Sequence, residues 1–222
     1  MTDSRDDLFT HIHKALRRGL YEMAIAAGAT DWSHHDDVTE LEARWRPLLS
    51  LLRSHTVHED RHILRILDAH APKVTERPAD EHADLDGLLD DLATRFDHAL
   101  ADRSSAAGLD WYRDLNRFVA AYLPHLHHEE TVVMQEIWQR CTDAEIAATR
   151  GAFTAETSPD DRTASLRLML PAVDRSTRRH LAQTLAATAP PSVLDLVLTI
   201  ADDVLSPADA AELRDAARGA NG

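Results

Sequence analysis

Apolar residues recur at spacings of three and four along most of the chain, the pattern of amphipathic helices. Four long segments show it, at residues 5–27, 38–70, 78–101 and 109–140. Each segment carries only one apolar stripe, so each must bury that stripe against the others. The connections of about 7 to 10 residues suit antiparallel neighbours. The pattern therefore predicts an all-α protein built on an up-down-up-down four-helix bundle.

Prolines and a glycine place the expected helix boundaries. Gly28 predicts the end of the first helix, and Pro78 the start of the third. Pro47 lies inside the second pattern and predicts either its true start or a kink, and Pro124 predicts a bend in the fourth.

The sequence pattern changes after residue 141, where long apolar stripes give way to closely spaced helix-capping signals. Capping signals at Thr142, Ser158 and Ser206 predict four or five short helices. We therefore expect two domains, a helical bundle over residues 1–140 and a helical extension over residues 141–222. The apolar run at 193–200 must be buried. The extension is either an annex covering one end of the bundle, or a lid or partner surface such as that of a homodimer.

Composition restricts the function classes. Among the 222 residues, 38 are acidic and 24 are basic, for a net charge of −14. This balance argues against nucleic-acid binding and against anionic membranes. The single cysteine, Cys141, excludes an internal disulfide, and no apolar stretch reaches the roughly 20 residues of a membrane span. The acidic beginning of the chain does not resemble a signal peptide. We expect a cytoplasmic protein.

Histidine is concentrated in the predicted bundle. Of 14 histidines, 13 lie at or before His128. Two H-x-x-x-E pairs, His55 with Glu59 and His125 with Glu129, place an imidazole and a carboxylate on one helix face. Both pairs continue apolar stripes, one ending on Ile63 and Ile66 and the other on Val132. A carboxylate in a core needs a counter-charge or a metal ion.

The other two helices each add a histidine on the inner stripe, His13 and His82. Counting residues along antiparallel helices brings all six side chains to about the same level. Four imidazoles and two carboxylates suit one or two first-row transition metals, with the carboxylates able to bridge a pair. The predicted ligand set is His13, His55, Glu59, His82, His125 and Glu129.

Four strings in this order carry a family resemblance: HKALRR from His13, HTVHED from His55, EHA from Glu81 and HLHHEE from His125. Together, over about residues 5–140, they resemble the hemerythrin-like, or HHE cation-binding, domain. The resemblance implies a four-helix bundle around a non-haem di-iron site with the same six residues as ligands. Oxygen-carrying hemerythrins add a histidine one turn after the third-helix histidine. Asp86 stands there in this chain, which makes it a candidate extra ligand and argues against reversible oxygen carriage.

The functional hypothesis follows from this resemblance. It is an oxidoreductase-type or catalase-like protein whose two iron ions, in a form that can carry an oxo bridge, react with dioxygen or peroxide. Manganese and zinc stay open as the metal. Tyr122, one turn before His125, is the candidate catalytic residue because its hydroxyl can donate to a bound oxygen species. Nitric oxide and a small-molecule substrate are further candidate partners. The alternatives are a sensor or store for oxygen, nitric oxide or iron, and a scaffold without metal.

Several other polar residues compete for a role. His58 and His62 form a rival H-x-x-x-H pair, for which we favour a place beside the site over ligation. Asp60 and Glu130 are expected either to face solvent or to hydrogen-bond a ligand histidine.

Overall fold

The computed structural model describes residues 5–219, and within this range it is helical throughout, with no strand. The all-α prediction is confirmed. The first part of the chain contains the following elements: α1 Thr10–Ala29, α2 His35–His58, η1 Glu59–Leu64, α3 Arg65–Asp68, α4 Pro72–Asp102, α5 Ser105–His128, η2 Glu129–Val133 and α6 Met134–Arg140. The two η segments are π-helical.

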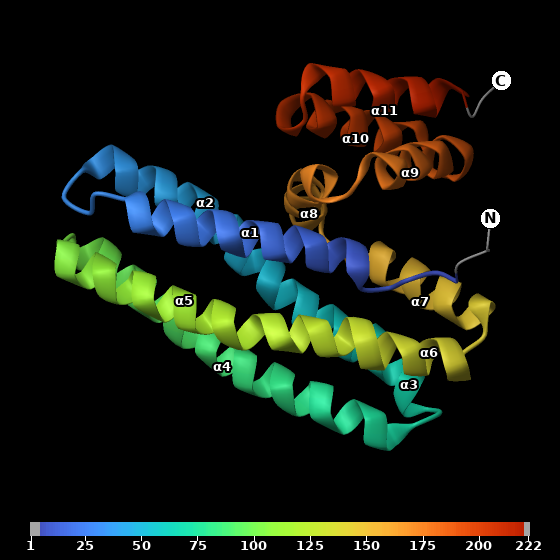
Figure 1. Ribbon diagram of the computed structural model, residues 1–222, viewed down its shortest axis with the longest axis horizontal. Helices are drawn as coiled ribbons and strands as arrows, with labels where there is room; N and C mark the ends of the chain where they lie inside the picture. The colour runs from blue at the N-terminus through green and yellow to red at the C-terminus, as the bar shows by residue number, and fades with distance from the viewer. Residues whose placement is uncertain (1–4, 220–222) are drawn as a thin grey trace.

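These elements form four long rods that lie side by side (Figure 1). The rods are α1, then α2 with η1 and α3, then α4, then α5 with η2 and α6. α1 packs against α2 and α5, and α4 packs against the same two helices. Short loops join consecutive rods. The apolar stripes of the four rods face one another in a shared core.

Local hydrogen bonds move some boundaries from the expected places. The first helix begins at Thr10 because the carboxylate of Asp7 accepts from the backbone N–H of Phe9 and of Thr10. The third begins at Pro72, with Pro78 inside it. Pro47 lies within α2, so it does not mark the start of that helix.

The two π-helical segments change which residues face inward after each glutamate. A π turn adds one residue to a helical turn, so the inner face moves by one position. Val132, expected inside, is 43% exposed, whereas its neighbour Val133 is fully buried. On the second rod, Leu67 is fully buried whereas Ile66 is only partly buried. Beyond the two glutamates, the predicted stripes are therefore confirmed at Ile63 and wrong at Ile66 and Val132.

Two apolar clusters fill the space between the rods, one at each side of a polar layer. The larger cluster includes Leu16, Leu52 and Tyr122, and the smaller includes Phe9 and Val133. His13 lies between Phe9 and Leu16 along α1, and the two H-x-x-x-E pairs occupy the same level on their rods. The polar layer is thus closed off on both sides by packed apolar side chains.

Five short helices follow: α7 Asp143–Glu156, α8 Pro159–Ala172, α9 Arg175–Thr188, α10 Pro191–Val204 and α11 Pro207–Gly219. Their first residues are sixteen positions apart throughout. The caps expected at Thr142 and Ser158 are formed, the first as a complete capping box with Glu145. Asp174 caps α9 in the same way.

Two of the five helices, α7 and α8, pack on the flank of the rods, and α8 to α11 pack on one another. α7 contacts η1, and α8 packs against α1 and α2 (Figure 1). Gly19 allows this approach, since a Cβ there would lie 2.8 Å from Cδ1 of Leu48 and 3.0 Å from Cδ1 of Leu168. Val197 and Ile200 of the apolar run are buried in a third cluster with Leu170. Among residues 5–219, no helix is both long and apolar enough to cross a bilayer.

Candidate metal centre

Six buried side chains from the four rods meet in the polar layer. They are the six predicted ligands, His13, His55, Glu59, His82, His125 and Glu129, and each is 3% exposed or less. α1 supplies one of them, α4 another, and the other two rods each supply a histidine and the glutamate that follows it by four residues.

The six side chains form two overlapping groups of four. His13 and His55 share one group with Glu59 and Glu129, and His82 and His125 share the other with the same two glutamates. Within each group, one ligand atom per residue lies within 4.8 Å of all the others. We call these groups the α1–α2 half and the α4–α5 half. Both glutamates belong to both halves, which is the arrangement that a bridged metal pair requires.

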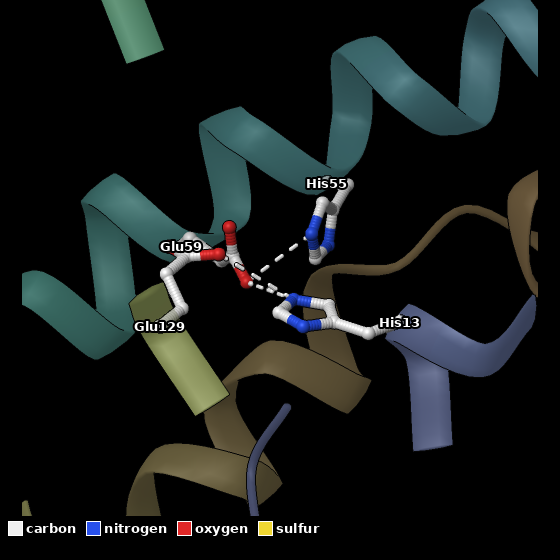
Figure 2. A group of neighbouring side chains, drawn as sticks. All are labelled: His13, His55, Glu59 and Glu129. Atoms are coloured by element: carbon white, nitrogen blue, oxygen red, sulfur yellow. Dashed lines mark hydrogen bonds and ion pairs between the residues drawn. The ribbon is translucent and has the colours of Figure 1, made fainter. Parts of the chain in front are cut away.

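Figure 2 shows the α1–α2 half, with the side chains of His13 and His55 directed at the carboxylates. Oε1 of Glu59 lies 3.2 Å from Nε2 of His55 and 3.4 Å from Nε2 of His13. Oε2 of Glu129 lies 3.5 Å from Nε2 of His13.

The α4–α5 half has similar spacings. Nε2 of His82 lies 3.5 Å from Oε2 of Glu59 and 3.4 Å from Oε1 of Glu129. Nε2 of His125 lies 3.2 Å from Oε2 of Glu129. The two imidazole nitrogens Nε2 are 3.1 Å apart. Glu59 thus presents one oxygen to each half.

The backbone places both glutamates in the same way. Glu59 and Glu129 are each the first residue of a π-helical segment that follows four residues after a histidine. The backbone N–H of each glutamate approaches two carbonyls, those of the residues three and four positions before it. π turns inside α-helices are frequent at functional sites. The two rods therefore have the same local structure, a glutamate at the start of a π-helical segment, at the same level.

Three of the four histidines also have a carboxylate contact at Nδ1, the second ring nitrogen. Nδ1 of His82 lies 2.7 Å from Oδ1 of Asp60, and Nδ1 of His125 lies 3.0 Å from Oε2 of Glu81. Nδ1 of His13 lies 3.2 Å from Oε1 of Glu130. Such contacts fix the tautomer that leaves Nε2 free to bind a metal ion. Asp60 and Glu130 thus each contact a ligand histidine, and Asp60 is also exposed to solvent.

Glu81 begins one of the four family strings, but the sequence assigned it no role. It comes from α4, one position before His82, and its Oε1 accepts from Nε of Arg77 at 2.7 Å. Glu130 is likewise held by Arg17, at 2.5 and 3.0 Å. The sequence signal for Glu81 was weak, because an acidic residue near a basic one on a helix is an ordinary surface pattern.

Burial and ion pairing set the charges of the metal-free centre. Burial and the neighbouring cations lower the pKa of His55 to about 3, although Glu59 opposes this, so His55 is neutral. Burial opposes the charge on His13, yet hydrogen bonds to Glu130 and Glu59 outweigh it and raise its pKa to about 9. For His82, contacts with Asp60 and both glutamates likewise outweigh burial and raise the pKa to about 12.

The donor atoms fit a cation better than they fit one another. Nε2 of His55, Oε2 of Glu59 and both carboxylate oxygens of Glu129 are buried without a hydrogen-bond partner among the described residues. Buried polar atoms are almost always hydrogen-bonded, so four exceptions at one point need an explanation. Metal ions satisfy imidazole nitrogens and carboxylate oxygens at once, and this donor set suits first-row transition metals.

Tyr122 lies one turn before His125 and is 2% exposed. Its ring stacks on Phe118, with centroids 5.3 Å apart, and its hydroxyl has no hydrogen-bond partner among residues 5–219. Burial, together with the nearby Glu59 and Glu129, raises the pKa of the phenol well above its usual range. The hydroxyl is therefore a protonated donor without an acceptor in the described part of the chain.

The remaining candidates lie outside both groups. Asp86 is exposed and contributes no atom to either half. The rival pair is directed at α7, where the ring centroid of His58 lies 4.9 Å from that of Phe153 and Nε2 of His62 lies 3.2 Å from Glu156.

Comparison with known proteins identifies one family. The model of the hemerythrin HHE cation-binding domain matches residues 4–137, which include all six side chains of the centre. Among curated proteins and among solved structures, no significant match to this chain was found.

Proposed function

The chain belongs to the hemerythrin HHE cation-binding domain family, and from this premise we propose that it is a di-iron protein that reacts with dioxygen or peroxide. The observation that carries the proposal is the pair of buried four-residue groups that share Glu59 and Glu129. The arrangement of the rods supports an up-down-up-down four-helix bundle of the hemerythrin type. Residues 141–222 form, on this proposal, a separate helical extension.

The chain's own residues would hold two ions. His13 and His55 would bind one, His82 and His125 the other, and the two glutamates both. Iron is our first choice, and manganese or zinc would fit the same donors. Asp86 stays a predicted extra ligand, which the substitution Asp86→Ala tests. If iron content and peroxide reactivity are unchanged, Asp86 has no such role.

A bound iron pair would supply two electrons to dioxygen or peroxide. The protein contributes a site that excludes bulk water, because apolar clusters pack on both sides of the polar layer. In a medium of low polarity, the charges of the centre act on a small ligand with little screening. Tyr122 supplies a hydrogen-bond donor that no described residue uses.

One contact favours a second function, that of a sensor or store for oxygen, nitric oxide or iron without turnover. η1 begins at Glu59 and contains Arg61 and His62, which both contact Glu156 of α7. A structural change at Glu59 would thus be transmitted to α7 of the extension through these contacts. Turnover distinguishes this function from the first.

Metal content and reactivity test the proposal. Protein purified from iron-replete cells should contain about two irons per chain and show the visible absorption of a ferric pair. It should also release oxygen from peroxide or consume dioxygen in the reduced state. Two irons without any such reaction would favour the sensor, and absence of metal or tight zinc alone would overturn the redox proposal.

Tyr122→Phe tests the proposed donor. We expect unchanged iron content and a rate of peroxide or dioxygen reaction about tenfold lower, the effect of losing about 1.4 kcal/mol of stabilisation. Tyr112→Phe is the matched control on the same helix, outside the centre. An unchanged rate in Tyr122→Phe would assign this tyrosine to packing alone.

A further inference from the structure

The two halves of the centre use equal donor sets but are supported unequally. Each half has two imidazoles and the same two carboxylates. The difference lies behind the imidazoles, at Nδ1. An acceptor at Nδ1 orients the ring and makes Nε2 a stronger donor, and its loss typically costs 10- to 100-fold in metal affinity, as an order of magnitude.

In the α4–α5 half, both imidazoles have a short carboxylate contact. His82 meets Asp60 at 2.7 Å, and His125 meets Glu81 at 3.0 Å. Glu81 divides its oxygens, with Oε2 for His125 and Oε1 for Arg77. The imidazole therefore does not compete with the guanidinium for one oxygen.

In the α1–α2 half, support is weaker at one histidine and missing at the other. Nδ1 of His13 lies 3.2 Å from Oε1 of Glu130, the longest of the three contacts. The same oxygen accepts from Arg17 at 2.5 Å, so its negative charge is already engaged. Nδ1 of His55 is buried and has no partner among residues 5–219.

Binding through Nε2 would leave the Nδ1–H of His55 as a buried donor without an acceptor, which carries a desolvation cost. In the α4–α5 half no such cost arises, and the two Nε2 atoms already converge to 3.1 Å. The contacts at Nδ1 and the spacing of the Nε2 atoms thus both favour the α4–α5 half.

We infer that the two metal sites differ in affinity, with the α4–α5 half filling first and the α1–α2 half filling second and losing its ion first. This inference rests on the proposed function, because it assumes that the centre binds two ions. It gives the molecule a state with one ion retained at His82 and His125 and the other exchangeable. The one unsupported histidine predicts a ratio of dissociation constants of about 10- to 100-fold.

Stepwise loading with Zn²⁺ tests the order. The metal-free full chain, labelled with ¹⁵N-histidine, is titrated with zinc and followed by NMR, with each ring assigned from its His→Gln variant. In the first equivalent we expect the Nε2 signals of His82 and His125 to move, and in the second those of His13 and His55. Simultaneous movement, or the reverse order, would overturn the inference.

Two variants test the cause. Asp60→Asn and Glu81→Gln should each weaken the tighter zinc site by about 10- to 100-fold in calorimetric titration, with little change at the weaker one. Asp90→Asn is the matched control, since this exposed carboxylate of α4 pairs with Arg53 instead. Unchanged affinity in both variants would refute the role of Nδ1.

The outcomes separate this inference from the proposed function. Two equal zinc sites in a protein that reacts with peroxide when loaded with iron would remove the inference alone. Ordered zinc sites in an iron-loaded protein without any reaction would remove the redox proposal alone. A chain that binds no zinc and no iron would overturn both.

Discussion

At the scale of single residues, the two glutamates differ in kind from the four histidines. Each histidine belongs to one half, whereas Glu59 and Glu129 belong to both. The metal-free centre also depends on them, because they face the positively charged His13 and His82. Removing a partner from a buried ion pair leaves an uncompensated charge. A glutamate variant should therefore be more damaging than a histidine variant.

Glu59→Ala should abolish binding of both ions, whereas His13→Ala should abolish only the ion of the α1–α2 half. The reason is that Oε1 of Glu59 lies 3.2 Å from Nε2 of His55 and Oε2 lies 3.5 Å from Nε2 of His82. Metal analysis of the purified variants measures the difference. Glu40→Ala, an exposed position on the same rod, is the control. Equal metal content in the first two variants would contradict the shared role.

At the scale of elements, the π-helical segments and the caps decide where side chains point. η1 and η2 place a glutamate at the start of a wider turn and move the apolar face by one position beyond it. The short helices depend instead on their first residues. Asp174 accepts from the backbone N–H of Thr177 at 3.0 Å and from its hydroxyl at 2.7 Å.

Deleting Arg61 tests the π turn. Removing one residue from η1 should restore an ordinary α-helical turn and displace the Glu59 carboxylate, because a π turn is an α turn with one residue added. We expect far-UV circular dichroism to stay helical while metal content falls by at least half. The control is Arg61→Ala, which loses the contact with Glu156 but keeps the length. Full metal content in the deletion would show that the π turn is dispensable.

Asp174 gives a prediction of pH dependence. Hydrogen bonds from the backbone and side chain of Thr177 lower the pKa of Asp174 from 3.8 to about 2. A lowered pKa means that the ionised cap stabilises the fold above pH 3.8 and that this contribution is lost as the pH falls towards 2. The melting temperature of Asp174→Ala should thus lie below that of the wild type at pH 5, and the two should converge near pH 2. A constant difference would contradict this assignment.

At the scale of the whole molecule, the centre connects all four rods while the third apolar cluster holds the extension together. The two clusters beside the polar layer contain no ligand, so they should keep the rods folded without metal. The extension is joined to the rods through α7 on η1 and α8 on α1 and α2. Metal should therefore add stability to a chain that is already folded.

Removal of metal with a chelator should lower the melting temperature but leave a cooperative transition. A ligand that binds only the folded state adds about 2.7 kcal/mol when its free concentration is about 100 times its Kd. Differential scanning calorimetry of loaded and metal-free protein measures the shift, and re-addition of metal should reverse it. Loss of the transition in the metal-free protein would mean that the apolar clusters alone do not hold the fold.

The sequence by itself determined the helical character of the chain and the six side chains that the four rods bring together. The reason is that helical periodicity fixes which face a residue occupies, and histidine and glutamate on an apolar stripe have few stable partners other than a metal ion. The capping residues Thr142 and Ser158 could also be predicted, because a helix cap depends on residues close together in the sequence.

Only the tertiary structure decided the features that depend on more than one rod. Val132, which lies on the predicted stripe, is exposed within the π-helical segment that begins at Glu129, because a π turn shifts the residues that face the other rods. The supports at Nδ1 join residues as far apart as His13 and Glu130, which no spacing along one helix reveals. The unequal support of His55 and His82 arises in the same way, from the packing of separate helices around a shared pair of carboxylates.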